Sequence, residues 1–114
     1  MISAINSSLS GIDASLKRFD TSAHNTANLS TSGFKKDTIL QSENGTAAVV
    51  VHIEKSLTPG LQLPSPDGSI IEGSNVDLAE EASHQIIARA ALGANLAALK
   101  STLEAEKSII DIIV

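Results

Sequence analysis

Histidine and glutamate side chains at two places in the chain have the spacing of metal ligands. His52 and Glu54 would lie on one face of a β-strand, because strand side chains alternate between faces. Glu81 and His84 have the helical spacing found in carboxylate-bridged di-metal bundles. Such a bundle needs a second Glu-x-x-His pair, and the predicted helix at the N-terminus contains two aspartates but no glutamate. The sequence therefore favours an acidic helical turn with a solvated histidine, and we expect no metal and no other cofactor.

Serine is abundant enough to suggest nucleophilic catalysis, but no Gly-x-Ser-x-Gly elbow and no glycine-rich phosphate loop is present. We therefore expect that the protein is not an enzyme and has no small-molecule substrate. Lys35 and Lys36 stand beside Asp37, which makes a poor phosphate site and favours a solvated turn. Phe34 follows Gly33 directly, and we expect it to anchor that turn against an apolar surface of this chain or another.

Composition narrows the classes of partner. The net charge is −5 and no dense run of basic residues occurs, so nucleic acid is an unfavourable partner. Cysteine is absent, which excludes disulfides and cysteine-ligated zinc. No stretch of about twenty apolar residues is available to cross a bilayer, and we expect no membrane insertion.

The first helix is predicted from an apolar stripe that steps by three and four residues alternately. Polar residues fill the positions between and suit the outer face of a helix that packs against one partner. We expect this stripe to form half of a coiled-coil seam; its members are Ile2, Ile5, Leu9, Ile12, Leu16 and Phe19.

The second long helix is predicted over residues 74–114. A Ser-x-x-Asp capping pattern opens it at Ser74, and three acidic residues, Asp77, Glu80 and Glu81, lie near the positive end of the helix dipole. The same alternating step gives the other half of the seam: Leu92, Leu96, Leu99, Leu103 and Ile110. A further stripe is lined with small residues, which would allow another helix to approach closely: Ile86, Ala90, Gly93 and Ala97.

The segment between the helices has β-branched runs broken by proline and glycine. Strands are predicted over Thr46–Lys55 and Ser69–Glu72, as a small hairpin or two short strands, followed by a proline-bearing loop. One domain is expected, mainly α: an antiparallel coiled coil of the N- and C-terminal helices with a short β-hairpin insertion. Its parts are the helix 1–28, a turn and extended segment 29–44, the β insertion and loop 45–73, and the helix 74–114.

Two motifs carry a resemblance to a known family. The stretch "NTANLSTSGFKK" resembles the signature that follows the first helix of flagellar basal-body rod and hook axial proteins, through Asn25, Ala27, Asn28, Thr31, Gly33, Phe34 and Lys35. The stretch "SNVDLAEE" resembles the family's entry into its last helix, through Ser74, Asn75, Val76, Asp77, Leu78, Glu80 and Glu81. Ala94 and Asn95 match a later Ala-Asn of the family.

The chain departs from the family pattern at several positions. Ala82 replaces a usual methionine, Ala90 a usual arginine, and Leu92 a common aromatic residue. The middle segment is short, so the similarity is to a small rod-type protein or a shortened paralogue.

The resemblance implies a structural subunit of the flagellar rod or an adjoining axial structure, which assembles through its terminal helices and transmits torque. Its partners would be further copies of itself, other flagellar axial proteins and the flagellar type III export apparatus. It would reach the periplasmic rod of the basal body without a cleaved signal peptide. The alternative is a soluble helical-hairpin binding module that interacts with an export or regulatory factor.

The signature stretch has a physical interpretation as a joint. Asn25 and Asn28 are expected to end the first helix by satisfying free backbone groups, and Gly33 permits a sharp turn. The stretch would thereby fix how the chain leaves the coiled coil.

Overall fold

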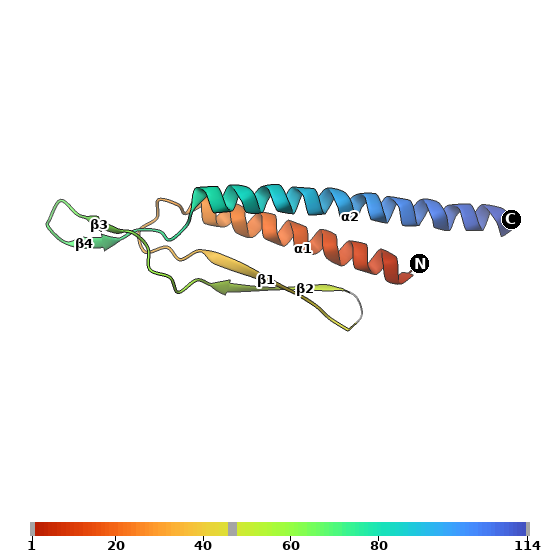
Figure 1. The fold of residues 1–114 in the computed structure, drawn as a ribbon, viewed down its shortest axis with the longest axis horizontal. Coiled ribbons are helices and arrows are strands. Elements are labelled where there is room, and N and C mark those ends of the chain that lie inside the picture. Colours follow the sequence, from red (N-terminus) through yellow and green to blue (C-terminus); the bar gives the residue numbers. More distant parts are fainter. Residues whose placement is uncertain (1, 46–47, 114) are drawn as a thin grey trace.

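Two long helices lie side by side, and two β-hairpins complete the molecule (Figure 1). This computed structural model describes residues 2–45 and 48–113. The molecule is elongated, at 79 × 24 × 14 Å. The helices are α1 (Ile2–Ala27) and α2 (Leu78–Ile113); the strands are β1 (Asp37–Glu43), β2 (Val49–Lys55), β3 (Gln62–Pro64) and β4 (Ile70–Glu72).

The helices run in opposite directions, because Ser22 of α1 meets Glu81 at the start of α2 whereas Gly11 meets Asn95 further along. Both ends of the chain consequently point to the same end of the molecule, and α2 continues past the beginning of α1 (Figure 1). The predicted pairing of an N-terminal and a C-terminal helix is confirmed. No helix in residues 2–45 and 48–113 combines the length and apolar character that crossing a bilayer requires.

The β insertion contains two hairpins. Strands β1 and β2 pair antiparallel from Asp37 with Lys55 to Glu43 with Val49, and this hairpin lies alongside α1 (Figure 1). Strands β3 and β4 form a second hairpin, which extends beyond the helices at the end opposite the termini.

The two predicted strands are confirmed over Val49–Lys55 and Ile70–Glu72, while Thr46 lies outside the described residues. They do not pair with each other. β1, which the sequence indicated only as an extended segment, pairs with β2, and β3 lies within the expected proline-bearing loop.

The face of α1 that meets α2 is lined by small and polar side chains. Across from them, Ala88 and Glu81 are the buried side chains of α2 among the described residues. A Cβ added to Gly11 would lie 2.5 Å from Oδ1 of Asn95, so the Asn95 side chain of α2 lies directly against Gly11. The buried residues of α1 are Ser8, Gly11, Ala14, Ser15, Ser22 and Asn25.

The predicted apolar seam is therefore wrong as a description of how α1 and α2 meet within one chain. Seven of its members are exposed: Ile2, Leu9, Leu16, Phe19, Leu96, Leu103 and Ile110. Four are half-buried at its edge: Ile5, Ile12, Leu92 and Leu99. The heptad period identifies an apolar face of a helix but not the partner that covers it. The buried small residues of α1 lie beside this apolar face and allow a closer contact with α2. The small-residue stripe of α2, Ile86, Ala90, Gly93 and Ala97, is also exposed.

The start of α2 differs from the predicted cap. Asp77 is the capping residue, since its Oδ1 accepts hydrogen bonds from the N–H groups of Ala79 (2.8 Å) and Glu80 (3.2 Å). Ser74 instead accepts a hydrogen bond from the N–H of Val76 in the preceding turn. The physical reason is that the chain stays extended through Asn75, whose side chain is used elsewhere.

The close contact at Gly11 predicts opposite effects for one substitution at two glycines. Gly93→Ala adds a methyl group with nothing within 4 Å and should stabilise the fold by about 0.5–1 kcal/mol through helix propensity. Gly11→Ala must displace Asn95, so it should be less stable than Gly93→Ala by about 1–3 kcal/mol. Urea unfolding of dilute protein, followed by circular dichroism, measures both; equal stabilities would contradict the close contact.

Candidate functional site

Asn25 joins three elements through one buried side chain. Its Nδ2 donates hydrogen bonds to the carbonyl of Asp37 (2.8 Å) and to Oε1 of Glu81 (2.9 Å), while its Oδ1 accepts from the N–H of Asp37 (2.8 Å). The amide thus pairs with both backbone groups of the first residue of β1, as a neighbouring strand would. Since only 1% of Asn25 is exposed, these bonds are shielded from water and fix α1, α2 and β1 together.

Glu81 is a buried carboxylate with one satisfied oxygen. Its Oε1 accepts the bond from Asn25, and its backbone carbonyl accepts a bond from Oγ of Ser22 (3.0 Å). Oε2 has no hydrogen-bond partner within the described structure; Nδ1 of His84 lies 3.6 Å away. A buried carboxylate oxygen without a donor is costly, so this atom marks a place where a further group could bind.

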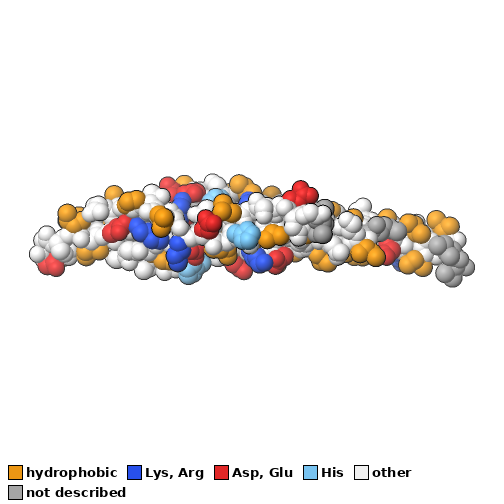
Figure 2. Space-filling model, turned by 90° about the horizontal axis from the view of Figure 1, so that it is seen from below, with side chains coloured by type: hydrophobic (Ala, Val, Ile, Leu, Met, Phe, Trp, Pro, Cys, Tyr) orange, Lys and Arg blue, Asp and Glu red, His pale blue; other side chains and the backbone are white. Residues whose placement is uncertain are grey.

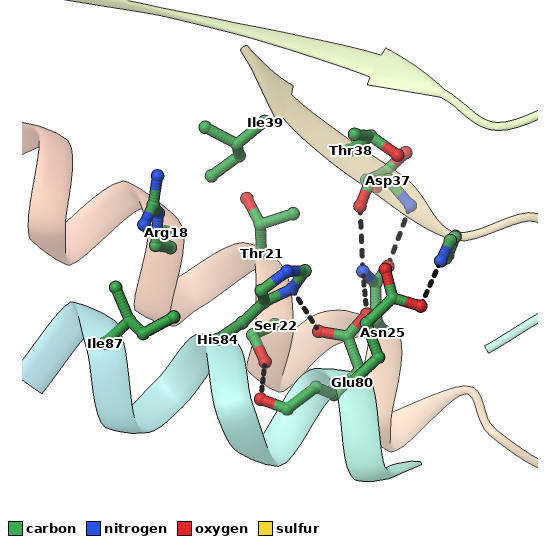
Figure 3. A pocket seen from close by; sticks show the side chains of 12 residues that line it. Arg18, Thr21, Ser22, Asn25, Asp37, Thr38, Ile39, Glu80, His84 and Ile87 are labelled. Carbon is green, nitrogen blue, oxygen red and sulfur yellow. Dashed lines mark hydrogen bonds and ion pairs between the residues drawn. The ribbon is translucent and has the colours of Figure 1, made fainter. Parts of the chain in front are cut away.

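A cleft of about 280 Å³ lies beside this carboxylate, between α1, α2 and β1 (Figure 3). Arg18 and Thr21 come from α1, and His84 and Ile87 come from α2 (Figure 3). The remaining residues that line it are Ser22, Asn25, Lys36, Asp37, Thr38, Ile39, Glu80 and Glu81. Buried polar side chains therefore form the bottom of the cleft, and charged, polar and apolar side chains together form its sides.

Most charges around the cleft are already paired. Lys36 contacts Glu80 at 2.6 Å, and Lys55 contacts Asp37 at 3.0 Å. The guanidinium of Arg18 donates to the neutral Oε1 of Gln41 (2.8 Å). The unsatisfied oxygen of Glu81 is thus the distinctive feature of this polar site.

The two predicted motifs meet at the base of the helices. Gly33 has a φ of 68° and its N–H donates to the carbonyl of Glu72 (2.8 Å). The N–H of Asn75 donates to the carbonyl of Phe34, and Oδ1 of Asn75 accepts from the N–H of Lys36 (2.7 Å). The turn after α1 is thereby hydrogen-bonded to the segment that enters α2.

Phe34 has polar neighbours, and the lysines differ from the expectation. Phe34 is half-buried, with its ring edge-on to that of His24 (5.5 Å between centroids) and Nζ of Lys55 5.7 Å from its centroid; the apolar surface expected for it stays a prediction. Lys35 bonds to the carboxylate of Glu72, and Lys36 is paired as described above. The expected solvated lysine turn is wrong, because strand β4 and helix α2 bring carboxylates to it.

The other signature residues have more local roles. Nδ2 of Asn28 donates to the carbonyl of His24, which satisfies a free group of the last helical turn as expected. Oγ1 of Thr31 donates to Oδ1 of Asn28. Ala27 is the last residue of α1 and is exposed, Leu78 is exposed at the first turn of α2, and Val76 is half-buried.

The two His/Glu pairs with metal-ligand spacing lie on different elements. His52 and Glu54 are both exposed on β2, and Glu81 with His84 lies at the cleft. Within residues 2–45 and 48–113, no group of three or more histidine or acidic side chains is arranged to hold a metal ion.

Some site residues were not identified from the sequence. The sequence pattern assigns Ser22 and Arg18 of α1 to the polar outer face of the helix. It indicates Asp37 only as a neighbour of the two lysines. The signal available was the heptad-spaced row of Ser8, Ser15 and Ser22, which together with Gly11 marks a face of small residues.

Comparison with protein-family models and with curated proteins gave no match. The resemblance to flagellar axial proteins therefore depends on the two motifs alone.

Removing the Asn25 side chain should destabilise the joint strongly. Asn25→Ala leaves the backbone groups of Asp37 and the carboxylate of Glu81 unpaired in a buried place, which should cost about 2–4 kcal/mol of unfolding free energy. Asn28→Ala is the matched control, because its bonds are exposed and should cost less than about 1 kcal/mol. Similar losses for both variants in urea unfolding would contradict the role of Asn25.

Glu72 should make stability depend on pH. The hydrogen bond from Lys35, then that from the N–H of Gly60 (2.7 Å), lowers the pKa of Glu72 below its ordinary value of 4.5. The unfolded chain therefore takes up this proton first, and the stabilisation is complete above pH 4.5 and lost as the pH falls through the lower folded pKa.

Thermal unfolding between pH 6 and pH 3 checks this expectation. Glu72→Gln should lose less stability than the wild type over the acid range, starting from a lower value at pH 6. The acid dependence due to Asp67, whose pKa the hydrogen bonds of Ser69 lower to about 2, remains in both proteins. Parallel pH profiles would contradict a stabilising role of the ionised Glu72.

Proposed function

We propose that this protein is a structural subunit of the bacterial flagellar basal-body rod or an adjoining axial structure. The observation that carries the proposal is that α1 and α2 pair through small and polar side chains, which leaves the large apolar residues of both helices exposed. Such a surface favours association, because an isolated soluble chain rarely exposes long apolar stripes without a partner.

The exposed stripe of α1 is suited to further helices. Leu9, Leu16 and Phe19 follow one another along the helix with 49%, 47% and 44% of their surfaces exposed. On α2, the side chains of Leu96, Leu103 and Ile110 are likewise exposed one after another along the helix. In the proposed assembly these side chains form coiled-coil seams with neighbouring copies or other axial proteins, so that torque is transmitted through packed helices.

The joint supports the same function. The hydrogen bonds of Asn25, Gly33 and Asn75 connect the end of α1, the hairpins and the entry of α2. A subunit whose helices leave the joint at a fixed angle would set a constant spacing between copies. The proposed location is the periplasmic rod, reached through the flagellar type III export apparatus.

A second candidate is a soluble binding module for an export or regulatory factor. The β3–β4 end favours it, because Leu61, Leu63 and Ile70 are exposed there to 70%, 45% and 70%. This end projects past the helices and could present the apolar side chains to a partner (Figure 1).

Mass spectrometry of detergent-extracted basal bodies from the encoding bacterium tests the primary proposal. We expect peptides of this chain in stoichiometric amounts alongside other rod proteins. Its absence from intact basal bodies, with soluble protein in the cytoplasm, would contradict the rod function and favour the binding module.

Gly33→Val should impair assembly more than folding. A side chain at φ 68° costs about 1–2 kcal/mol of strain, although no atom lies within 4 Å of the added Cβ. Gly68→Val is the matched control, since it places comparable strain (φ 83°) at the turn of the β3–β4 hairpin. Incorporation into basal bodies, compared by quantitative mass spectrometry, should fall for Gly33→Val only; normal incorporation would contradict the joint.

A further inference from the structure

The Glu81 carboxylate is the acidic group of the cleft that has no lysine or arginine partner in the part of the chain that the structure describes. Of the other carboxylates that line the cleft, Glu80 is paired with Lys36 and Asp37 is paired with Lys55. The Glu81 side chain is 1% exposed and its Oε2 has no hydrogen-bond donor among the described residues. A cationic donor would satisfy this oxygen.

His84 covers the unsatisfied oxygen. Its Nδ1 lies 3.6 Å from Oε2 of Glu81, and 43% of its side chain is exposed. The imidazole can therefore rotate towards solvent and give an entering group access to the carboxylate. Arg18 remains held by Gln41 on the opposite wall.

The chain itself offers a suitable cation. In residues 2–45 and 48–113, Arg89 and Lys107 are the basic side chains without a hydrogen-bond or ion-pair partner. Arg89 is the better donor for a buried carboxylate, because its planar guanidinium forms paired hydrogen bonds and is less strongly hydrated than an ammonium group.

Arg89 cannot reach the cleft of its own chain. At about 100° per residue, it lies about 140° around α2 from His84 and about 160° from Ile87, which both line the cleft. It is exposed on the opposite side of the helix, near Ala82 and Gly93. No atom lies within 4 Å of a Cβ added to Gly93, so this small-residue face can approach another molecule closely.

We propose that Arg89 of a second copy of this chain enters the cleft and pairs with Glu81. The inference rests on the proposed self-assembling function and names one of its contacts. Because Arg89 and the cleft-lining residues His84 and Ile87 lie on opposite sides of α2, the contact is heterologous: each copy gives Arg89 to one neighbour and receives it from another, which propagates an open assembly rather than a closed dimer.

The space-filling view shows charged and apolar side chains mixed on one face of the molecule (Figure 2). Basic, acidic and histidine side chains gather over the middle of the molecule, and apolar side chains continue towards both ends on this face. A salt-sensitive contact at the cleft would fix the register, while the apolar stripes supply most of the buried area.

Sedimentation velocity over a concentration series tests the pairing with the wild type and four variants. Arg89→Ala should raise the concentration for half-association about thirtyfold or more relative to wild type, whereas Lys107→Ala should leave it unchanged. Glu81→Gln keeps the side-chain volume and should weaken association similarly, with its folding checked by circular dichroism. Combining Arg89→Ala with Glu81→Gln should add little further weakening, since both changes remove one contact.

A cross-link locates the contact directly. The chain has no cysteine, so Gly93→Cys, which lies beside Arg89 on α2 and leaves Arg89 in place, should form a disulfide-linked dimer on oxidation when mixed with Thr38→Cys at the edge of the cleft. Lys107→Cys mixed with Thr38→Cys is the matched control and should not.

The outcomes distinguish a failure of the Arg89 pairing from a failure of the proposed self-assembly. Association that is unaffected by Arg89→Ala, or cross-linking of Lys107→Cys in place of Gly93→Cys, overturns the Arg89 pairing but leaves self-assembly intact. Monomeric wild-type protein at every concentration overturns the pairing together with self-assembly, and the basal-body measurement then decides whether the chain is incorporated through other axial proteins.

Discussion

The close approach of α1 and α2 is the constraint on which the rest of the structure depends. Gly11 lies directly beneath Asn95, and Ser15, Ser22 and Ala88 are buried along the same contact. Small side chains bring the two backbones together, and the larger apolar side chains are then displaced to the flanks. An ordinary helical hairpin would bury those residues, whereas this one leaves them available to other molecules.

The hydrogen bonds of Asn25 convert that contact into a fixed joint. They align the start of β1 with the end of α1 and hold Glu81 at the start of α2. Further along, Oγ of Ser10 accepts a hydrogen bond from the N–H of Val49, and Arg18 bonds to Gln41. The first hairpin is therefore placed along α1 by polar contacts, and the cleft arises where it meets both helices. The unsatisfied oxygen of Glu81 is the consequence of burying a carboxylate for this joint.

The sequence predicts the long helices and parts of the strands because heptads and β-branched runs are local signals. It could not predict that Ser22 and Asn25, rather than Leu16 and Phe19, face α2, because a period identifies a face without its partner. The residues of the joint were recognised through their motifs, yet the contact of Asn25 with Glu81 spans 56 positions and depends on the tertiary fold. The pairing of β1 with β2 was missed for a related reason, since β1 is short and polar at its ends and is stabilised by its neighbours.

The central claim is that the apolar face of α1 is covered by other molecules in the working form. The rate of thiol labelling at a single introduced cysteine, Leu16→Cys, tests it most directly, because the natural chain has no cysteine and Leu16 is 47% exposed. We predict rapid labelling in the dilute chain and at least about tenfold slower labelling in isolated basal bodies or concentrated assemblies. Equally rapid labelling in both would contradict the account, because the face would then remain open to solvent in the assembled state.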